Sequence, residues 1–186
     1  QQLAREVAAG VDKPLLIDGD GITALCAEPS ILAGRRGPTL LTPHGGEMAR
    51  LTGVTGREID ADRITIAQET AARFGVHIVL KGAHSLIAAP DRQVFINLSG
   101  NSGMATPGSG DVLAGVIAAM AGQGLDVTEA ARMGVFAHGL AGDLIAANSG
   151  ADGLLASDIL RMLPAAMQRA REGAPWDARY AGPKTT

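Results

Sequence analysis

The order of hydrophobic and polar residues along the chain indicates helices and strands that follow one another. Residues 1–10 place apolar side chains at a helical period. Residues 14–18 and 39–42 are short apolar runs, typical of strands buried in a parallel sheet. Residues 47–51 and 62–74 return to helical spacing, and a glycine follows the second segment where a helix end is expected.

A different pattern begins at residue 77. Three short β-like runs, 77–81, 85–89 and 93–98, follow one another closely, and residues 90–92 supply turn chemistry between the last two. These runs predict a β-meander at the edge of the sheet.

Helices dominate the remainder of the chain. Residues 111–121 and 128–148 are apolar and rich in small side chains, which predicts two closely packed helices. Ser157 has the side chain of an N-cap residue and predicts a third helix, which Pro164 is expected to kink or interrupt. The tail from Gly173 is expected to be irregular.

Strands that alternate with helices are typical of the α/β class. We therefore predict a mainly parallel, doubly wound sheet with the β-meander at its edge. No shift in composition marks a linker and no segment repeats, so residues 1–186 are interpreted as a single domain.

Composition mainly excludes classes of partner. Of the 186 residues, 46% are hydrophobic and 19% are charged, which is enough apolar material for a core. The net charge of −3 contains no long run of either sign, so neither nucleic acid nor an anionic membrane is an expected partner. No apolar run approaches the length of a membrane span. Cys26 is the only cysteine, which excludes an intramolecular disulfide and fits a cytoplasmic protein.

The segment NSGMATPGSGD at 101–111 carries the strongest chemical signal, because a loop of small residues opens directly into an apolar helix. Its glycines let backbone N–H groups approach an anion, and a helix N-terminus adds about half a positive charge. Asp111 would repel a bound phosphate, but it could accept a proton from a hydroxyl that attacks the phosphate. This pairing points to phosphoryl transfer. The alternative is a glycine-rich connection in which Asp111 only caps the helix.

Two further segments follow predicted strands, at the edge where open α/β sheets bind ligands. Residues 43–49 combine two glycines with His44, which can donate or accept a hydrogen bond near neutral pH. The segment could be a substrate loop, or it could be a capped turn in which Glu47 is only a favourable partner of a helix dipole. Lys81 could reach a nucleotide phosphate, or it could be a surface lysine in a hairpin turn.

Metal ligands are not assigned from the sequence. Asp18 and Asp20 could face the Mg²⁺ of a nucleotide, or they could cap the segment that follows them. His77, His84 and His138 lack metal-ligand spacing, and they are assigned no catalytic role.

In this order the segments resemble the NAD(P)H-hydrate dehydratase family of the ribokinase-like superfamily. GMATPGSGDVLAG at 103–115 is a near-complete match to the family signature, and TPHGGEMARL at 42–51 matches a second motif closely. Shorter matches, LKG at 80–82 and ASD at 156–158, extend the resemblance across nearly the whole chain. The resemblance implies a ribokinase-like three-layer sandwich.

The resemblance also implies a lyase that uses ADP or ATP, with Mg²⁺, to dehydrate (S)-NAD(P)H hydrate to NAD(P)H. The enzyme would phosphorylate the ring hydroxyl and then eliminate phosphate, with Asp111 as the base and Gly108, Ser109 and Gly110 stabilising the transferring group. The nucleotide would be held by Lys81, Gly82, Ala83, His84 and Ser85, and by Asn101, Ser102, Gly103, Met104, Ala105, Thr106, Pro107, Gly108, Ser109 and Gly110. The hydrated nicotinamide would lie against Pro43, His44, Gly45, Gly46, Glu47, Met48, Ala49 and Asp111.

Other expectations follow from the same resemblance. Roughly the first third of the family domain is absent, so strands of the sheet could be missing and activity could be weak. A homotetramer is implied by resemblance alone. The alternatives are a small-molecule kinase of the same superfamily and a nucleotide-binding module without catalysis. The MATP sequence at 104–107 and His44 argue against the kinase.

Overall fold

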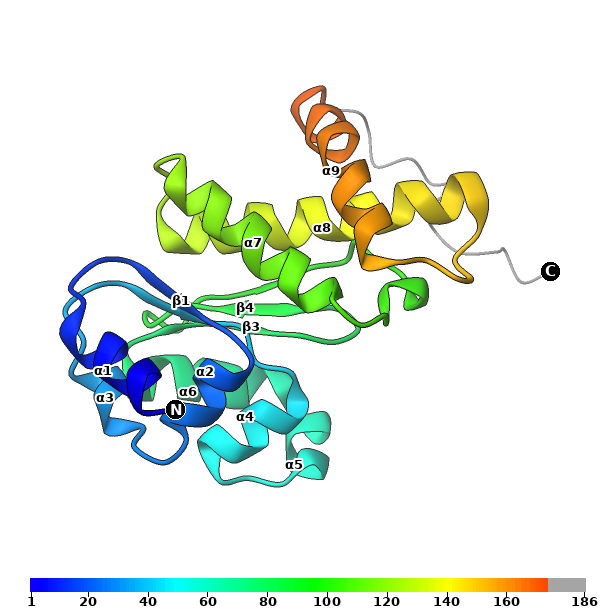
Figure 1. Ribbon diagram of the computed structural model, residues 1–186. Helices are drawn as coiled ribbons and strands as arrows, with labels where there is room; N and C mark the ends of the chain where they lie inside the picture. Colours follow the sequence, from blue (N-terminus) through cyan, green and yellow to red (C-terminus); the bar gives the residue numbers. More distant parts are fainter. Residues whose placement is uncertain (174–186) are drawn as a thin grey trace.

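The computed structural model describes residues 1–173, which form three layers around a central sheet (Figure 1). No helix in this range is long and apolar enough to cross a membrane. One face of the sheet is covered by α1 (Gln2–Gly10), α2 (Asp20–Leu25), α3 (Ser30–Ala33), α4 (Gly45–Thr52), α5 (Gly56–Ala61) and α6 (Arg63–Phe74). The other face is covered by α7 (Ser109–Gly122) and α8 (Val127–Ser149), and α9 (Ala156–Arg171) packs against these two helices.

The strands follow the order of the sequence across the sheet. They are β1 (Leu15–Ile17), β2 (Thr39–Leu41), β3 (His77–Leu80), β4 (Leu86–Ala88) and β5 (Val94–Ile96). The first three are parallel, because helices connect each of them to the next, and β3, β4 and β5 pair antiparallel. The predicted parallel strands and the β-meander at the edge are therefore confirmed.

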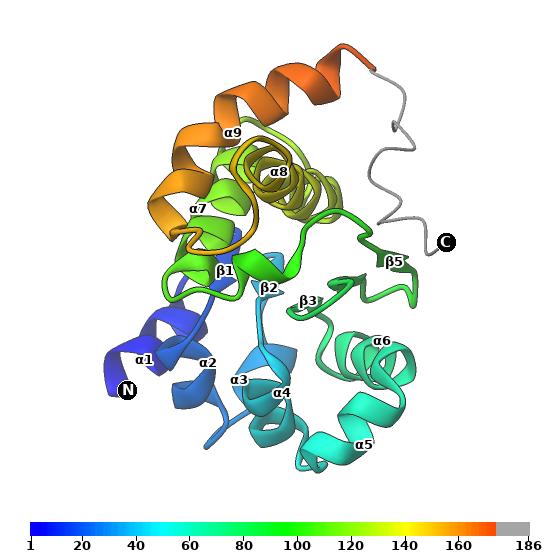
Figure 2. The same ribbon diagram turned by 90° about the vertical axis from the view of Figure 1, so that its right-hand side faces the viewer.

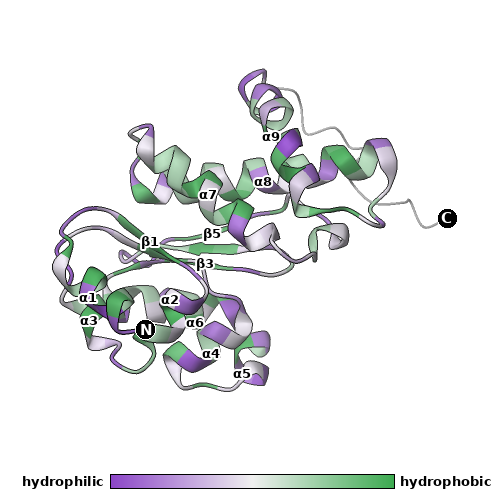
Figure 3. Ribbon diagram, in the orientation of Figure 1, coloured by the Kyte–Doolittle hydropathy of each residue, from purple (hydrophilic) through white to green (hydrophobic). Residues whose placement is uncertain are grey.

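Successive side chains of a strand point to opposite faces of the sheet, so each face has its own hydrophobic core. Leu41 and Ile78 face the layer of α1 to α6, whereas Leu40 and Val79 face α7 and α8. A strand buried on both faces has no polar side, which is why its sequence is a continuous apolar run. Figure 3 shows hydrophobic residues in both helical layers as well as in the sheet.

The last helix differs from its prediction at its N-cap, and Pro164 does not interrupt it. The prediction of Ser157 as N-cap is wrong: α9 begins at Ala156, and the Leu155 N–H donates to the Asp158 carboxylate at 3.1 Å. Pro164 lies within α9 without ending it. The helix is anchored on both sides of the proline, since Ile159 and Ala166 pack in one cluster with α8. The predicted irregular tail after Gly173 lies outside the described residues.

Gly75 offers a direct test of the predicted helix end. It terminates α6 in the left-handed conformation, φ +65°, and a Cβ there would meet nothing within 4 Å. Gly75→Ala is expected to lower the free energy of unfolding by about 1 kcal/mol, because alanine disfavours this conformation. Gly115→Ala, where a Cβ in α7 also meets open space, should raise it by up to about 1 kcal/mol through helix propensity. Urea denaturation measures both changes, and two shifts of the same sign would contradict this account.

Candidate active site

The carboxyl ends of β1, β2 and β3 meet at one edge of the sheet, which faces the viewer in Figure 2. Asp18 follows β1, Thr42 and Pro43 follow β2, and Lys81 follows β3. Backbone bonds join these segments: the Thr42 N–H donates to the Ile17 carbonyl at 3.2 Å, and the Lys81 N–H donates to the Pro43 carbonyl at 2.8 Å. The sequence prediction that these segments share an edge is confirmed.

Lys81 lies in a partly buried cluster of charges. Its Nζ is 2.8 Å from Oδ1 of Asp18 and 3.9 Å from Oε2 of Glu47, and its side chain is only 20% exposed. Lys81 does lie in the turn between the antiparallel strands β3 and β4, but the alternative that it is a surface lysine is wrong. Asp18 is engaged by this lysine, whereas Asp20 is exposed at the start of α2.

The segment after β2 is a capping box at the start of α4. His44 is the N-cap, and its Nδ1 accepts the N–H groups of Gly46 at 3.0 Å and Glu47 at 3.3 Å. The buried Glu47 carboxylate accepts the His44 N–H at 2.8 Å. Because Nδ1 accepts, the neutral ring carries its proton on Nε2. Glu47 is therefore more than a dipole partner: it fixes the backbone of His44, whose side chain is 55% exposed.

The glycine-rich loop enters α7 through a left-handed residue. Gly108 has φ +84°, and the helix begins at Ser109, two residues earlier than predicted. The Ser109 N–H donates to the Thr106 carbonyl at 3.2 Å. Within the described part of the chain no hydrogen bond occupies the N–H of Gly110 or Asp111. Both of these N–H groups at the helix N-terminus are thus unpaired, with the exposed Asp111 side chain in the same turn.

Lys81 and the first turn of α7 lie against each other. A Cβ placed on Gly110 would be 3.5 Å from Lys81 Nζ. An anion bound by the free N–H groups of Gly110 and Asp111 would therefore also meet the ammonium group. The arrangement can bind a phosphate and accept a proton from a hydroxyl beside it.

The other predicted nucleotide residues lie in two loops. Gly82, Ala83 and His84 are exposed in the turn after β3, whereas residues 102–104 form a 3-10 helix packed against α8. Both loops approach the carboxyl edge of the sheet.

Arg63, the first residue of α6, holds the turn of residues 81–85 and was not identified from the sequence. Its guanidinium donates to the carbonyls of Leu80 at 3.2 Å, Lys81 at 3.4 Å and Ala83 at 2.6 Å. A cation at a helix start is unfavourable for the helix dipole. That unfavourable position is the sequence signal that could have indicated a tertiary role for Arg63.

The described residues do not build a metal site of their own. No group of three or more His, Cys, Asp or Glu side chains among residues 1–173 could hold a metal ion. Mg²⁺ is commonly held by one or two carboxylates together with substrate phosphates. The arrangement therefore fits an ion that arrives with a nucleotide, with Asp18 as the nearest carboxylate of the Lys81 cluster.

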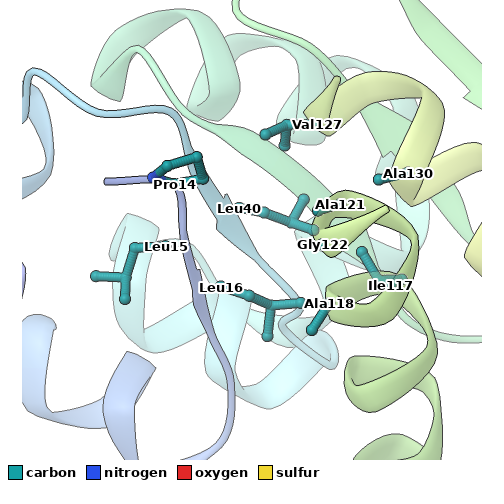
Figure 4. A pocket seen from close by; sticks show the side chains of 10 residues that line it. All are labelled: Pro14, Leu15, Leu16, Leu40, Ile117, Ala118, Ala121, Gly122, Val127 and Ala130. Atoms are coloured by element: carbon teal, nitrogen blue, oxygen red, sulfur yellow. The ribbon is translucent and has the colours of Figure 1, made fainter. Parts of the chain in front are cut away.

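An apolar cavity of about 290 Å³ lies away from this site (Figure 4). It is lined by Leu16 and Leu40 from the sheet, Ala121 from α7 and Ala130 from α8, and by further apolar residues. Ala121 lies ten residues after Asp111 on the same helix, which separates them by about 15 Å. No lining side chain is charged, so this cavity is not the place for phosphoryl chemistry.

The profile of the NAD(P)H-hydrate dehydratase family matches residues 1–165. The chain belongs to this family. The bifunctional NAD(P)H-hydrate repair enzyme of Thermofilum pendens is 52% identical over 171 residues, which cover 92% of this chain and 33% of that protein. This chain thus spans about a third of that relative.

Two solved structures extend the comparison to the fold. The ADP/ATP-dependent NAD(P)H-hydrate dehydratase of Bacillus subtilis, co-crystallised with ATP/Mg²⁺, is 35% identical with a TM-score of 0.77, over 87% of this chain and 56% of that one. A ribokinase-like superfamily protein of Enterococcus faecalis is 32% identical with a TM-score of 0.78, over 90% of this chain and 57% of that one. The predicted family and ribokinase-like α/β fold are confirmed.

Proposed function

We propose that this dehydratase-family chain catalyses the nucleotide-dependent dehydration of (S)-NAD(P)H hydrate to NAD(P)H, a lyase reaction that repairs the nicotinamide cofactor. One observation carries the proposal: the first turn of α7 holds Asp111 and two free N–H groups, and the Lys81 ammonium lies beside that turn. The family supplies the reaction class, and its Bacillus subtilis member is named for dependence on ADP or ATP.

The nucleotide would bind between residues 81–85 and 101–110. Its terminal phosphate would accept the N–H groups of Gly110 and Asp111, with Lys81 as the neighbouring cation. Arg63 would keep the first of the two loops in place. Mg²⁺ bound to the phosphates would neutralise part of their charge.

The hydrated nicotinamide would lie against residues 43–49, beside Lys81. The exposed His44 ring, whose Nε2 also lies 3.5 Å from Oε1 of Glu47, would donate its Nε2 proton to a polar group of the ligand. Glu47 would act on the substrate only through His44, because its carboxylate is buried and closes the capping box. With these roles, the hydroxyl of the hydrate would lie between His44 and Asp111.

The chemistry follows from the poor leaving ability of hydroxide. Asp111 accepts the proton of the ring hydroxyl, the hydroxyl oxygen bonds to the terminal phosphorus, and the bond from that phosphorus to the nucleotide breaks. Phosphate then leaves the ring carbon, and a proton leaves the neighbouring carbon, which restores the double bond of NAD(P)H. The N–H groups at the start of α7 stabilise charge on the transferring group.

The test is recovery of NADH absorbance when the chain and Mg²⁺ are mixed with NADH hydrate and either ADP or ATP. Recovery that requires a nucleotide is the expected result, and the better nucleotide identifies the donor. A folded chain that binds nucleotide but restores no absorbance would contradict the proposal. A phosphorylated hydrate that accumulates without dehydration would instead indicate a kinase.

Lys81→Met is expected to weaken ADP binding about tenfold, because a charge-assisted contact to phosphate is lost. The variant should also be less stable, since Asp18 and Glu47 lose their shared cation in a partly buried site. Lys13→Met removes an exposed lysine and serves as the control. Calorimetric titration with Mg²⁺ and ADP measures the affinity, and equal affinities for both folded variants would remove Lys81 from the nucleotide site.

A cytoplasmic location and a homo-oligomeric state belong to the same proposal. The family resemblance supports both, and a homotetramer is the specific expectation. Sedimentation equilibrium of the purified chain measures the oligomeric state directly.

A further inference from the structure

The loop of residues 99–110 packs along one face of α8. His138, Gly139, Gly142 and Asp143 form that face, since they are spaced four apart in two adjacent rows. Figure 2 shows α8 and this loop next to each other, above the ends of the strands. His138 and Asp143 form hydrogen bonds with the loop, and the two glycines allow its backbone to approach the helix closely.

Asp143 holds the start of the loop with both carboxylate oxygens. Oδ2 accepts the Gly100 N–H at 2.8 Å, and Oδ1 accepts the Asn101 side-chain amide at 3.0 Å. Asn101 in turn accepts the Gly103 N–H at 3.0 Å. One carboxylate therefore holds the backbone of Gly100 directly and that of Gly103 through the Asn101 side chain.

His138 holds the end of the loop. Its Nε2 is 3.0 Å from the carbonyl oxygen and 3.4 Å from the hydroxyl of Ser109, and the side chain is buried with 7% exposure. A carbonyl oxygen can only accept, so Nε2 carries the proton and donates it to this bond. The bond fixes the first residue of α7, immediately before Gly110 and Asp111.

The two glycines bring the backbones together between these bonds. A Cβ on Gly139 would lie 2.2 Å from Ser99 Oγ and 2.7 Å from the Ser99 carbonyl oxygen. A Cβ on Gly142 would lie 2.2 Å from Met104 Sδ. Helix α8 is therefore in direct contact with the loop, and the hydrogen bonds of His138 and Asp143 join two closely packed surfaces.

We propose that His138 and Asp143 are positioning residues that fix the two ends of the nucleotide loop; the inference rests on the proposed function. Both would act through the loop residues that they bind, without contact with the nucleotide or the reacting hydroxyl. Asp143 acts through Asn101 on the nucleotide contacts, whereas His138 acts through Ser109 on the orientation of Asp111 and its neighbouring N–H groups. Their loss should therefore change different kinetic constants.

Asp143→Asn is expected to raise KM for ADP about tenfold and to change kcat by less than about twofold. An amide at this position places its NH₂ group against one of two donors, the Gly100 N–H or the Asn101 amide. Amides 100–103 should exchange faster with deuterium in the free protein. An unchanged KM for ADP together with unchanged exchange would overturn the role of Asp143.

His138→Leu is expected to lower kcat about tenfold while KM for ADP changes by less than about twofold. Leucine fills the volume but donates no hydrogen bond to Ser109. His138→Gln should recover part of kcat, because its amide can donate to the same carbonyl. Equal losses in both variants would overturn the role assigned to the hydrogen bond.

Ala137→Gly provides the control for a merely structural effect. This buried neighbour lies in α8 but belongs to neither bond, so its substitution weakens the helix without releasing the loop. Kinetic changes in Ala137→Gly equal to those in the two variants would overturn the inference.

Calorimetric titration with ADP tests this inference separately from the proposed function. Asp143→Asn should bind ADP more weakly even if the chain dehydrates no hydrate. Dehydration by all variants with the wild-type kcat and KM would overturn this inference but would leave the proposed function in place.

Discussion

Asp111→Asn is expected to lower the turnover of NADH hydrate by at least about 100-fold, the low end of what a general base contributes. Asparagine keeps the shape and the helix position, but it cannot take the proton of the ring hydroxyl. ADP should bind equally well or up to about threefold more tightly, because a carboxylate repels the phosphate that the helix N-terminus attracts. Single-turnover measurements at saturating ADP report the rate, and calorimetric titration reports the affinity.

The matched control is Glu129→Gln. Asp111 and Glu129 both occupy the third position of a helix, in α7 and α8 respectively, so both substitutions remove the same favourable charge from a helix start. That loss destabilises a helix by about 0.3–1 kcal/mol. A rate that falls equally in both variants would assign the effect to helix stability. An undiminished rate in Asp111→Asn alone would remove the carboxylate from the reaction.

Much of the candidate site could be predicted because its chemistry is local in sequence. Each parallel strand is a continuous apolar run, and the polar residues that follow β1, β2 and β3 necessarily reach the same edge. The glycine-rich loop and Asp111 are contiguous, so their relation to the helix start is visible without a structure. What the pattern left open was the environment of Lys81, since its partner Asp18 lies 63 residues away.

The residues that hold the site could not be predicted for the same reason. Arg63 contacts carbonyls 17 to 20 residues away, His138 contacts Ser109 across 29 residues, and Asp143 contacts Gly100 across 43. No periodicity encodes these partners. The helices α3 and α5 were missed because their 4 and 6 residues are too short to show a helical period.

His138 should make the chain sensitive to moderate acid. Burial is the larger cause and lowers the pKa of His138 to about 4, from 6.5 for the free side chain, although the hydrogen bond to Ser109 acts in the opposite direction. The folded protein therefore keeps the imidazole neutral at pH values where the unfolded chain already binds a proton. The contribution of the neutral His138 to the free energy of unfolding is fully present above pH 6.5 and is lost progressively as the pH falls toward 4.

The size of this loss follows from the two pKa values. The gap between these two pKa values corresponds to about 3 kcal/mol at pH 4, a large fraction of the stability of a typical domain. His138→Gln does not titrate, so its stability should fall between pH 7 and pH 4 by about 3 kcal/mol less than that of the wild type. Urea denaturation of both proteins across this range measures the difference. Carboxylates titrate in both proteins alike and cancel, so parallel curves would mean that His138 is charged or solvated in the folded state. A difference confined to pH 4–6.5 would instead show that the group holding the start of α7 is a buried, neutral imidazole.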